Sequence, residues 1–129
     1  MASATLNVSF SISSTDLFDS ISLSKTVSDA LTIDGDNRQG LTTMKTTTSY
    51  DDINVNALSG STGGGKKAYV YAKNLDATDD LIFADDGDQI FCRLAPGEFA
   101  FYPTADNTKI QCKSSANTPI VEFMLLEVD

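Results

Sequence analysis

Gln89-Ile90-Phe91-Cys92-Arg93-Leu94, Ala95-Pro96-Gly97-Glu98 and Phe99-Ala100-Phe101-Tyr102 follow one another directly, and together they decide the fold. Side chains alternate between the two faces of a strand, so the first run places Ile90, Cys92 and Leu94 on one face. In the middle run, Pro96 sets φ for the second position of a tight turn, and Gly97 permits the positive φ that a type II turn needs at the third. We therefore predict a β-hairpin at Pro96-Gly97 whose two arms are rich in aromatic residues.

The same alternation recurs along the rest of the chain. Residues 6–12 place Leu6, Val8, Phe10 and Ile12 on one face, the pattern of a half-buried strand. No segment holds a helical period of 3.6 residues over three turns. The runs that we expect to be strands are 6–12, 20–27, 41–50, 53–57, 67–75, 81–83, 89–94, 99–102, 109–113 and 119–128. Their number and spacing predict an all-β protein, an antiparallel β-sandwich of roughly eight to ten strands, for which we expect jelly-roll connectivity.

Length and composition favour a single domain over residues 1–129. Residues 59–65 form a Gly/Ser-rich stretch that we interpret as a flexible loop inside that domain, because neither half of the chain has enough apolar residues to fold alone. The Ser/Thr-rich residues 1–14 are a candidate N-terminal arm, which could add a strand to a neighbouring subunit.

The charge balance excludes several classes of partner and of chemistry. The chain carries a net charge of −9, which argues against a nucleic-acid surface because phosphate binding needs clustered Lys and Arg. No apolar run reaches the ~20 residues that span a bilayer, and the first residues lack the pattern of a secretory signal, so no membrane partner is expected. The chain contains no His, which removes the Ser-His and Cys-His devices of nucleophilic catalysis. We expect no enzyme activity and no cofactor.

Two cysteines, Cys92 and Cys112, lie in phase with apolar neighbours, which favours buried free thiols. A disulfide between them stays open if their strands pair. A metal site is not expected, since two thiolates without His do not complete a tetrahedral zinc site. Asp85, Asp86 and Asp88 lack the spacing of a calcium loop and are interpreted as an acidic turn, although they are the first place to look for a bound cation.

Two other sets of side chains are candidates for a function. Glu98 and Glu122 are the interior carboxylates that could serve glycoside hydrolysis, and their positions favour solvated side chains instead. Aromatic residues gather on neighbouring expected strands, where they could form the sandwich core plus one exposed Tyr or Phe face, a subunit interface, or a sugar-stacking platform, which the absence of Trp disfavours. The aromatic set consists of Tyr69, Tyr71, Phe91, Phe99, Phe101 and Tyr102.

Three stretches follow one another in the second half of the chain. They are Tyr69-Val70-Tyr71-Ala72-Lys73-Asn74-Leu75 before an acidic turn, Ile90-Phe91-Cys92-Arg93-Leu94-Ala95-Pro96-Gly97-Glu98-Phe99-Ala100, and the closing Val121-Glu122-Phe123-Met124-Leu125-Leu126. The order of these three stretches resembles a family of small virion proteins of tailed bacteriophages. The resemblance covers about half of the chain, and the first 65 residues have no matching motif.

This resemblance implies a jelly-roll decoration (cement) protein on the outer capsid, assembled in the host cytoplasm. The implied partners are the major capsid protein and the chain itself, as a homotrimer. The acidic charge fits a location outside the shell, away from packaged DNA. The alternative is a glycan- or receptor-binding module of a head or tail fibre, which would need an exposed patch such as Tyr50-Asp51-Asp52 or the turn at residues 85–88.

Overall fold

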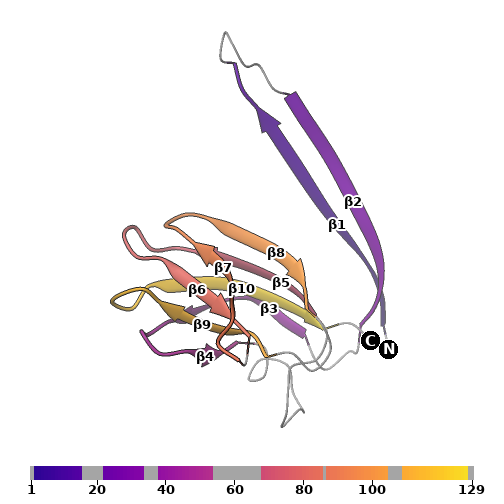
Figure 1. The fold of residues 1–129 in the computed structure, drawn as a ribbon. Helices are drawn as coiled ribbons and strands as arrows, with labels where there is room; N and C mark the ends of the chain where they lie inside the picture. Colours follow the sequence, from indigo (N-terminus) through magenta and orange to yellow (C-terminus); the bar gives the residue numbers. More distant parts are fainter. Residues whose placement is uncertain are drawn as a thin grey trace.

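The computed structural model describes residues 2–15, 22–33, 38–53, 68–85, 87–104 and 109–127, and these contain ten strands and no helix (Figure 1). The all-β prediction is thereby confirmed. The strands are β1 (Ala2–Ser13), β2 (Ser22–Ile33), β3 (Arg38–Lys45), β4 (Asp51–Asp52), β5 (Ala68–Asn74), β6 (Leu81–Ala84), β7 (Ile90–Leu94), β8 (Phe99–Pro103), β9 (Gln111–Ser114) and β10 (Ile120–Glu127). The predicted loop at 59–65, most of the strand expected at 53–57, and Asp86 fall outside the described residues. The described residues contain no helix that could span a lipid bilayer.

Eight of the strands form a sandwich of two antiparallel sheets. The first sheet has the order β3-β10-β5-β8, and the second has the order β4-β9-β6-β7. The pairing is nested: β3 pairs with β10, β4 with β9, β5 with β8 and β6 with β7. These nested pairs are those of one long antiparallel hairpin, with β3 to β6 as its first arm and β7 to β10 as its second, folded into two sheets.

The core lies between these two sheets and draws on both. Alternate residues of β5 are buried, so that Ala68, Val70 and Ala72 face inward as predicted, and they meet the fully buried Phe83 of β6 and Cys112 of β9. Each aliphatic or aromatic side chain withdrawn from water in this way contributes about 1.5–3 kcal/mol, which makes this layer the main source of stability.

The predicted hairpin at Pro96-Gly97 is wrong, although the turn itself is present. The Glu98 amide N–H donates to the Ala95 carbonyl at 3.0 Å, and Gly97 has φ of 80°. The strands on either side, however, belong to different sheets, because β7 pairs with β6 and β8 pairs with β5. The turn bonds instead to the end of β5: the Gly97 N–H donates to the Asn74 carbonyl at 3.0 Å, and the Asn74 N–H donates to the Glu98 carbonyl at 2.9 Å.

The face predicted for β7 is only half right. Leu94 is buried and Cys92 is partly buried, but Ile90 is 61% exposed. The pairing of β6 with β7 has an irregularity that lets Phe83 oppose Cys92 while Ala84 opposes Ile90. The extra residue at this bulge releases Ile90 from the inward phase, an effect that alternation alone does not reveal.

The other two strands form a ribbon separate from the sandwich. β1 and β2 pair along their whole length, from Ala2 opposite Ile33 to Ser13 opposite Ser22. Figure 1 shows this ribbon rising beside the sandwich and extending beyond it. The half-buried strand expected at residues 6–12 is therefore half-buried only near the sandwich, at Leu6 and Val8, while Phe10 and Ile12 are exposed.

Candidate interaction face

The outer surface of the β3-β10-β5-β8 sheet carries four residues of the aromatic set. Directly opposed residues of antiparallel strands share a face, and Tyr71 lies opposite Phe101 while Lys73 lies opposite Phe99. Tyr69 is two residues from Tyr71 and therefore points the same way. The sheet thus presents an aromatic face, which we define as Tyr69, Tyr71, Phe99 and Phe101. It lies opposite the core face formed by the buried residues of β5.

Tyr69 and Phe101 form the part of the aromatic face that meets the ribbon. Their rings are stacked, with centroids 5.6 Å apart and planes 15° apart. The Tyr69 hydroxyl donates to Oδ2 of Asp29 on β2 at 2.5 Å. This hydrogen bond, together with desolvation and the nearby charge of Asp29, raises the pKa of Tyr69. The hydroxyl therefore stays a donor through the neutral range, and it ties the ribbon to the sheet.

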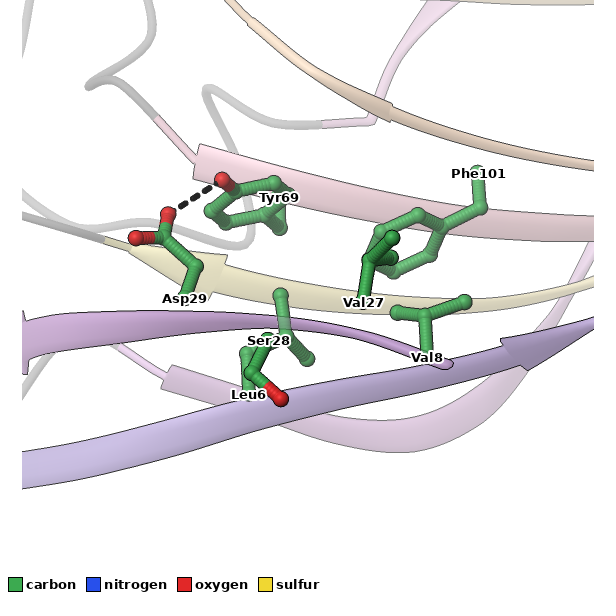
Figure 2. A pocket seen from close by; sticks show the side chains of 7 residues that line it. All are labelled: Leu6, Val8, Val27, Ser28, Asp29, Tyr69 and Phe101. Carbon is green, nitrogen blue, oxygen red and sulfur yellow. Dashed lines mark hydrogen bonds between the residues drawn. The ribbon is translucent and has the colours of Figure 1, made fainter. Parts of the chain in front are cut away.

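A cleft of about 300 Å³ opens between the ribbon and the aromatic face (Figure 2). Its ribbon wall is mainly apolar and its sheet wall is aromatic, and Figure 2 shows the side chains of Val8 and Val27 lying next to Phe101. The residues that line the cleft are Leu6, Val8, Val27, Ser28, Asp29, Tyr69 and Phe101. The ribbon and the sheet are thus held together by the burial of apolar side chains, and the hydrogen bond from Tyr69 to the Asp29 carboxylate sets their orientation.

Tyr71 continues the aromatic face away from the ribbon. Its hydroxyl donates to Oε1 of Glu122 on β10 at 2.9 Å. Desolvation, followed by the hydrogen bond to Glu122 and its charge, raises the pKa of Tyr71. Glu122 is thus held on the outer surface of the sheet, where it serves as an acceptor to a neighbouring tyrosine.

The remaining two aromatic residues lie elsewhere. Tyr102 is opposite Val70, on the core side of β8, and its ring meets that of Phe91 edge-on with centroids 5.6 Å apart. Burial is the main cause that raises the pKa of the Tyr102 hydroxyl far above its usual value. Among the described residues, this hydroxyl is the one buried side-chain polar atom without a hydrogen-bond partner. The fold thus divides the aromatic set: four residues form the aromatic face, and Tyr102 lies on the core side of β8 with Phe91 against it.

The cysteines cannot form a disulfide with each other. Cys92 and Cys112 both lie opposite Phe83, on the two flanks of β6. Neighbouring strands are about 4.8 Å apart, so two strands separated by a third place their Cα atoms roughly 9–10 Å apart, beyond the reach of a disulfide. Both thiols are free, and burial raises the pKa of Cys112 to about 12.

The acidic turn is closed by its own backbone. Oδ1 of Asp85 accepts from the N–H groups of Gly87 and Gln89, each at 2.9 Å, and Asp88 has φ of 59°. The Asp85 carboxylate thus stabilises the turn. Across the described residues, no group of three or more His, Cys, Asp and Glu side chains is placed to hold a metal ion.

The two glutamates that were weighed for hydrolysis have separate structural contacts. Glu98 lies in the turn between β7 and β8, where its Oε2 accepts from the Ala95 N–H at 2.8 Å. Glu122 lies on β10 and accepts from Tyr71. Each carboxylate therefore has a local role in holding the fold.

Sequence reasoning missed the ribbon wall of the cleft. Leu6 and Val8 were recognised as one face of a strand, but their meeting with Tyr69 and Phe101 depends on how the ribbon leaves the sandwich. The sequence did not indicate a role for Asp29, since it lies two residues beyond the alternating run 20–27 and its partner is 40 residues away.

Comparisons with models of protein families, with curated proteins and with solved structures found no match to this chain.

Proposed function

We propose that this chain is a non-enzymatic structural protein of a tailed-phage virion, which decorates the outer capsid and stabilises it by binding the major capsid protein. The observation that carries the proposal is the combination of a two-sheet sandwich with a projecting ribbon and an aromatic face. Contiguous exposed apolar surface of this kind is typical of protein–protein contact sites.

The connectivity supports the proposal. In the nested pairing, the first sandwich strand lies beside the last and the second beside the last but one, as expected for the jelly roll that we propose. Jelly rolls of eight strands in two sheets recur in viral capsid proteins and in lectins. The fold therefore agrees with the resemblance seen between Lys67 and Val128, and it leaves the lectin-like alternative to be tested.

The charge supports an outer location. A net charge of −9 would be repelled by densely packed DNA inside the shell. We therefore propose that the protein binds the outer surface of the shell. Its assembly in the host cytoplasm fits the two free thiols, and the homotrimer is what the resemblance to tailed-phage virion proteins implies.

Of the two patches that would favour the glycan-binding alternative, Tyr50-Asp51-Asp52 already makes contacts within the chain. The ammonium group of Lys113 lies 4.4 Å from the centroid of the Tyr50 ring, and Nζ of Lys109 lies 3.5 Å from Oδ2 of Asp52. A sugar that stacked on Tyr50 would have to displace Lys113 and its cation–π contact.

Binding to capsids tests the proposal directly. Purified protein is added to heads assembled from the major capsid protein of the same phage, and the heads are then sedimented and heated. We expect saturable co-sedimentation and a higher temperature of head disruption than in heads alone. Absence of co-sedimentation together with binding on a glycan array would refute the proposal in favour of the fibre module.

A further inference from the structure

The β1–β2 ribbon has two chemically different faces. Residues that lie directly opposite in the register share a face, as Phe10 does with Lys25 and Ile12 with Leu23. We call this side the apolar ribbon face; its members are Leu6, Val8, Phe10, Ile12, Leu23, Lys25, Val27 and Asp29. The other side is almost entirely Ser, Thr and Asn, with cross-strand hydrogen bonds such as Ser9 to Thr26 at 3.0 Å.

The half of the apolar ribbon face near the sandwich already has a partner. Leu6, Val8 and Val27 line the cleft over Tyr69 and Phe101, and Asp29 accepts from the Tyr69 hydroxyl. In this contact, aliphatic side chains of the ribbon lie against aromatic rings of the sheet, and a carboxylate at the edge accepts a hydrogen bond.

Among the described residues, the other half of the same face has no such partner. Phe10 is 45% exposed, Ile12 55% and Leu23 52%. Figure 1 shows that this end of the ribbon extends beyond the sandwich. A two-stranded ribbon alone is at best marginally stable in water, and exposed apolar surface of this kind favours association with another protein surface.

The aromatic face has a matching uncovered part. Phe99 on β8 is 64% exposed, and Ile120 on β10 and Leu41 on β3 of the same sheet are exposed as well. Glu122 lies among them on the outer side of β10; Lys73 opposite Glu122 and Lys45 opposite Ile120 point the same way, so this surface carries both charges. The uncovered half of the ribbon carries one charge, that of Lys25, to which Glu122 offers a carboxylate.

We infer that the uncovered half of the apolar ribbon face, Phe10, Ile12, Leu23 and Lys25, packs on the outer β3-β10-β5-β8 surface of a second copy of this chain. Lys25 lies against Glu122 of that copy, and the apolar residues cover Phe99 and its neighbours. The contact continues, between copies, the same ribbon-on-sheet packing that each copy makes within itself at Tyr69 and Phe101. It deepens the self-association named in the proposed function and assigns the surfaces that perform it.

A matched pair of double variants tests which ribbon face is used. Ile12→Lys with Leu23→Lys changes one opposed pair on the apolar face, while Ser11→Lys with Ser24→Lys changes the adjacent opposed pair on the polar face and adds the same charge. Light scattering and analytical ultracentrifugation of purified protein measure the mass against the 13.8 kDa of one chain. We expect the wild type and the polar-face variant to form the same oligomer. The apolar-face variant is expected to raise the dissociation constant by roughly a hundredfold or more, because it would bury charges without partners.

Mixing tests whether the ribbon meets a sheet or another ribbon. Phe99→Lys damages the receiving surface and leaves the ribbon intact, so alone it is expected to be monomeric. In a mixture of the two variants, the intact ribbon of Phe99→Lys can still pack on the intact sheet of the Ile12→Lys, Leu23→Lys variant. A 1:1 heterodimer of twice 13.8 kDa is therefore expected. Far-UV circular dichroism of each variant checks that the sandwich is folded.

Three results would overturn the inference: a wild type that is monomeric up to about 100 µM, equal weakening by both ribbon variants, or a mixture that stays monomeric. Oligomers of Phe99→Lys alone would also refute the inference and would indicate ribbon-on-ribbon packing, because that variant keeps its ribbon intact. Because the experiment contains no capsids, its failure leaves the capsid-binding test unaffected.

Discussion

Replacing Asn74 should destabilise the sandwich more than any other single polar substitution that we consider. Asn74 is the last residue of β5 and is fully buried. Its side-chain Nδ2 donates to the carbonyls of Asp79 at 2.8 Å and Leu94 at 3.1 Å, and its Oδ1 accepts from the Asp76 N–H at 2.9 Å. One side chain therefore joins the end of β5 to the β5–β6 turn and to the end of β7.

The size of the effect follows from these three bonds. Each contributes about 1 kcal/mol net, and a buried carbonyl left without a donor costs about 1–3 kcal/mol more. Asn74→Ala is thus expected to lower the free energy of unfolding by about 3–5 kcal/mol, a large part of the ~5–15 kcal/mol of a typical domain. Asn74→Asp keeps the acceptor for Asp76 but points a carboxylate at two carbonyl oxygens, so we expect it to be no less damaging at neutral pH.

Urea unfolding followed by far-UV circular dichroism measures these changes, since the chain has no Trp for fluorescence. Asn7→Ala is the matched control: Asn7 is exposed on the ribbon, and its Oδ1 accepts from Ser28 at 2.6 Å. The control should change stability by no more than about 0.5 kcal/mol. The reasoning is refuted if Asn74→Ala costs less than about 1 kcal/mol, or no more than the control does.

Three further predictions concern the turn, the core and the ribbon contact. Gly97→Ala should destabilise by about 1–2 kcal/mol in the same urea assay, purely through the positive φ, because nothing lies within 4 Å of the added Cβ; Gly97→Asn should cost less, and equal costs would contradict this explanation. Tyr102→Phe removes the buried hydroxyl without a partner, so thermal unfolding should show unchanged or higher stability, by up to about 1 kcal/mol, and a clear loss would mean that the hydroxyl is satisfied. The folded-state pKa of Tyr69 is raised, so the stabilisation from its bond to Asp29 is present below the ordinary tyrosine pKa of 10.0 and is lost as pH rises through the higher folded value. Tyr69→Phe should therefore flatten the dependence of unfolding free energy on pH above 10.0, and an unchanged slope would argue against the contact.

Local patterns in the sequence located most of the strands and the inward face of β5. The strand expected at 41–50 ends at Lys45, however, and β4 (Asp51–Asp52) falls between two expected runs. Alternation located β5 and assigned Ala68, Val70 and Ala72 to the core, because a strand has only two faces and apolar residues occupied one of them. The Pro96-Gly97 turn was equally local, since it depends on the φ that each of these two residues allows.

Which strand pairs with which was decided by the tertiary structure alone. The Pro96-Gly97 turn would suit a hairpin. Its backbone is instead hydrogen-bonded to Asn74, 23 residues earlier, and β7 and β8 belong to different sheets. The aromatic face arose in the same way, since Tyr71 and Phe101 become neighbours only through the pairing of β5 with β8. Alternation states that a side chain has an inner or an outer face, and it carries no information on which distant strand supplies its neighbour.

The ribbon shows the same division. Leu6, Val8, Phe10 and Ile12 share one face because of the strand period, and the sequence alone determined that. Whether that face is buried depends on where the ribbon leaves the sandwich: the same pattern is partly covered at Leu6 and Val8 and open at Phe10 and Ile12. The sequence determined which side of each strand is apolar, and the tertiary structure decided what lies against it, because burial is a property of two surfaces brought together and not of one strand.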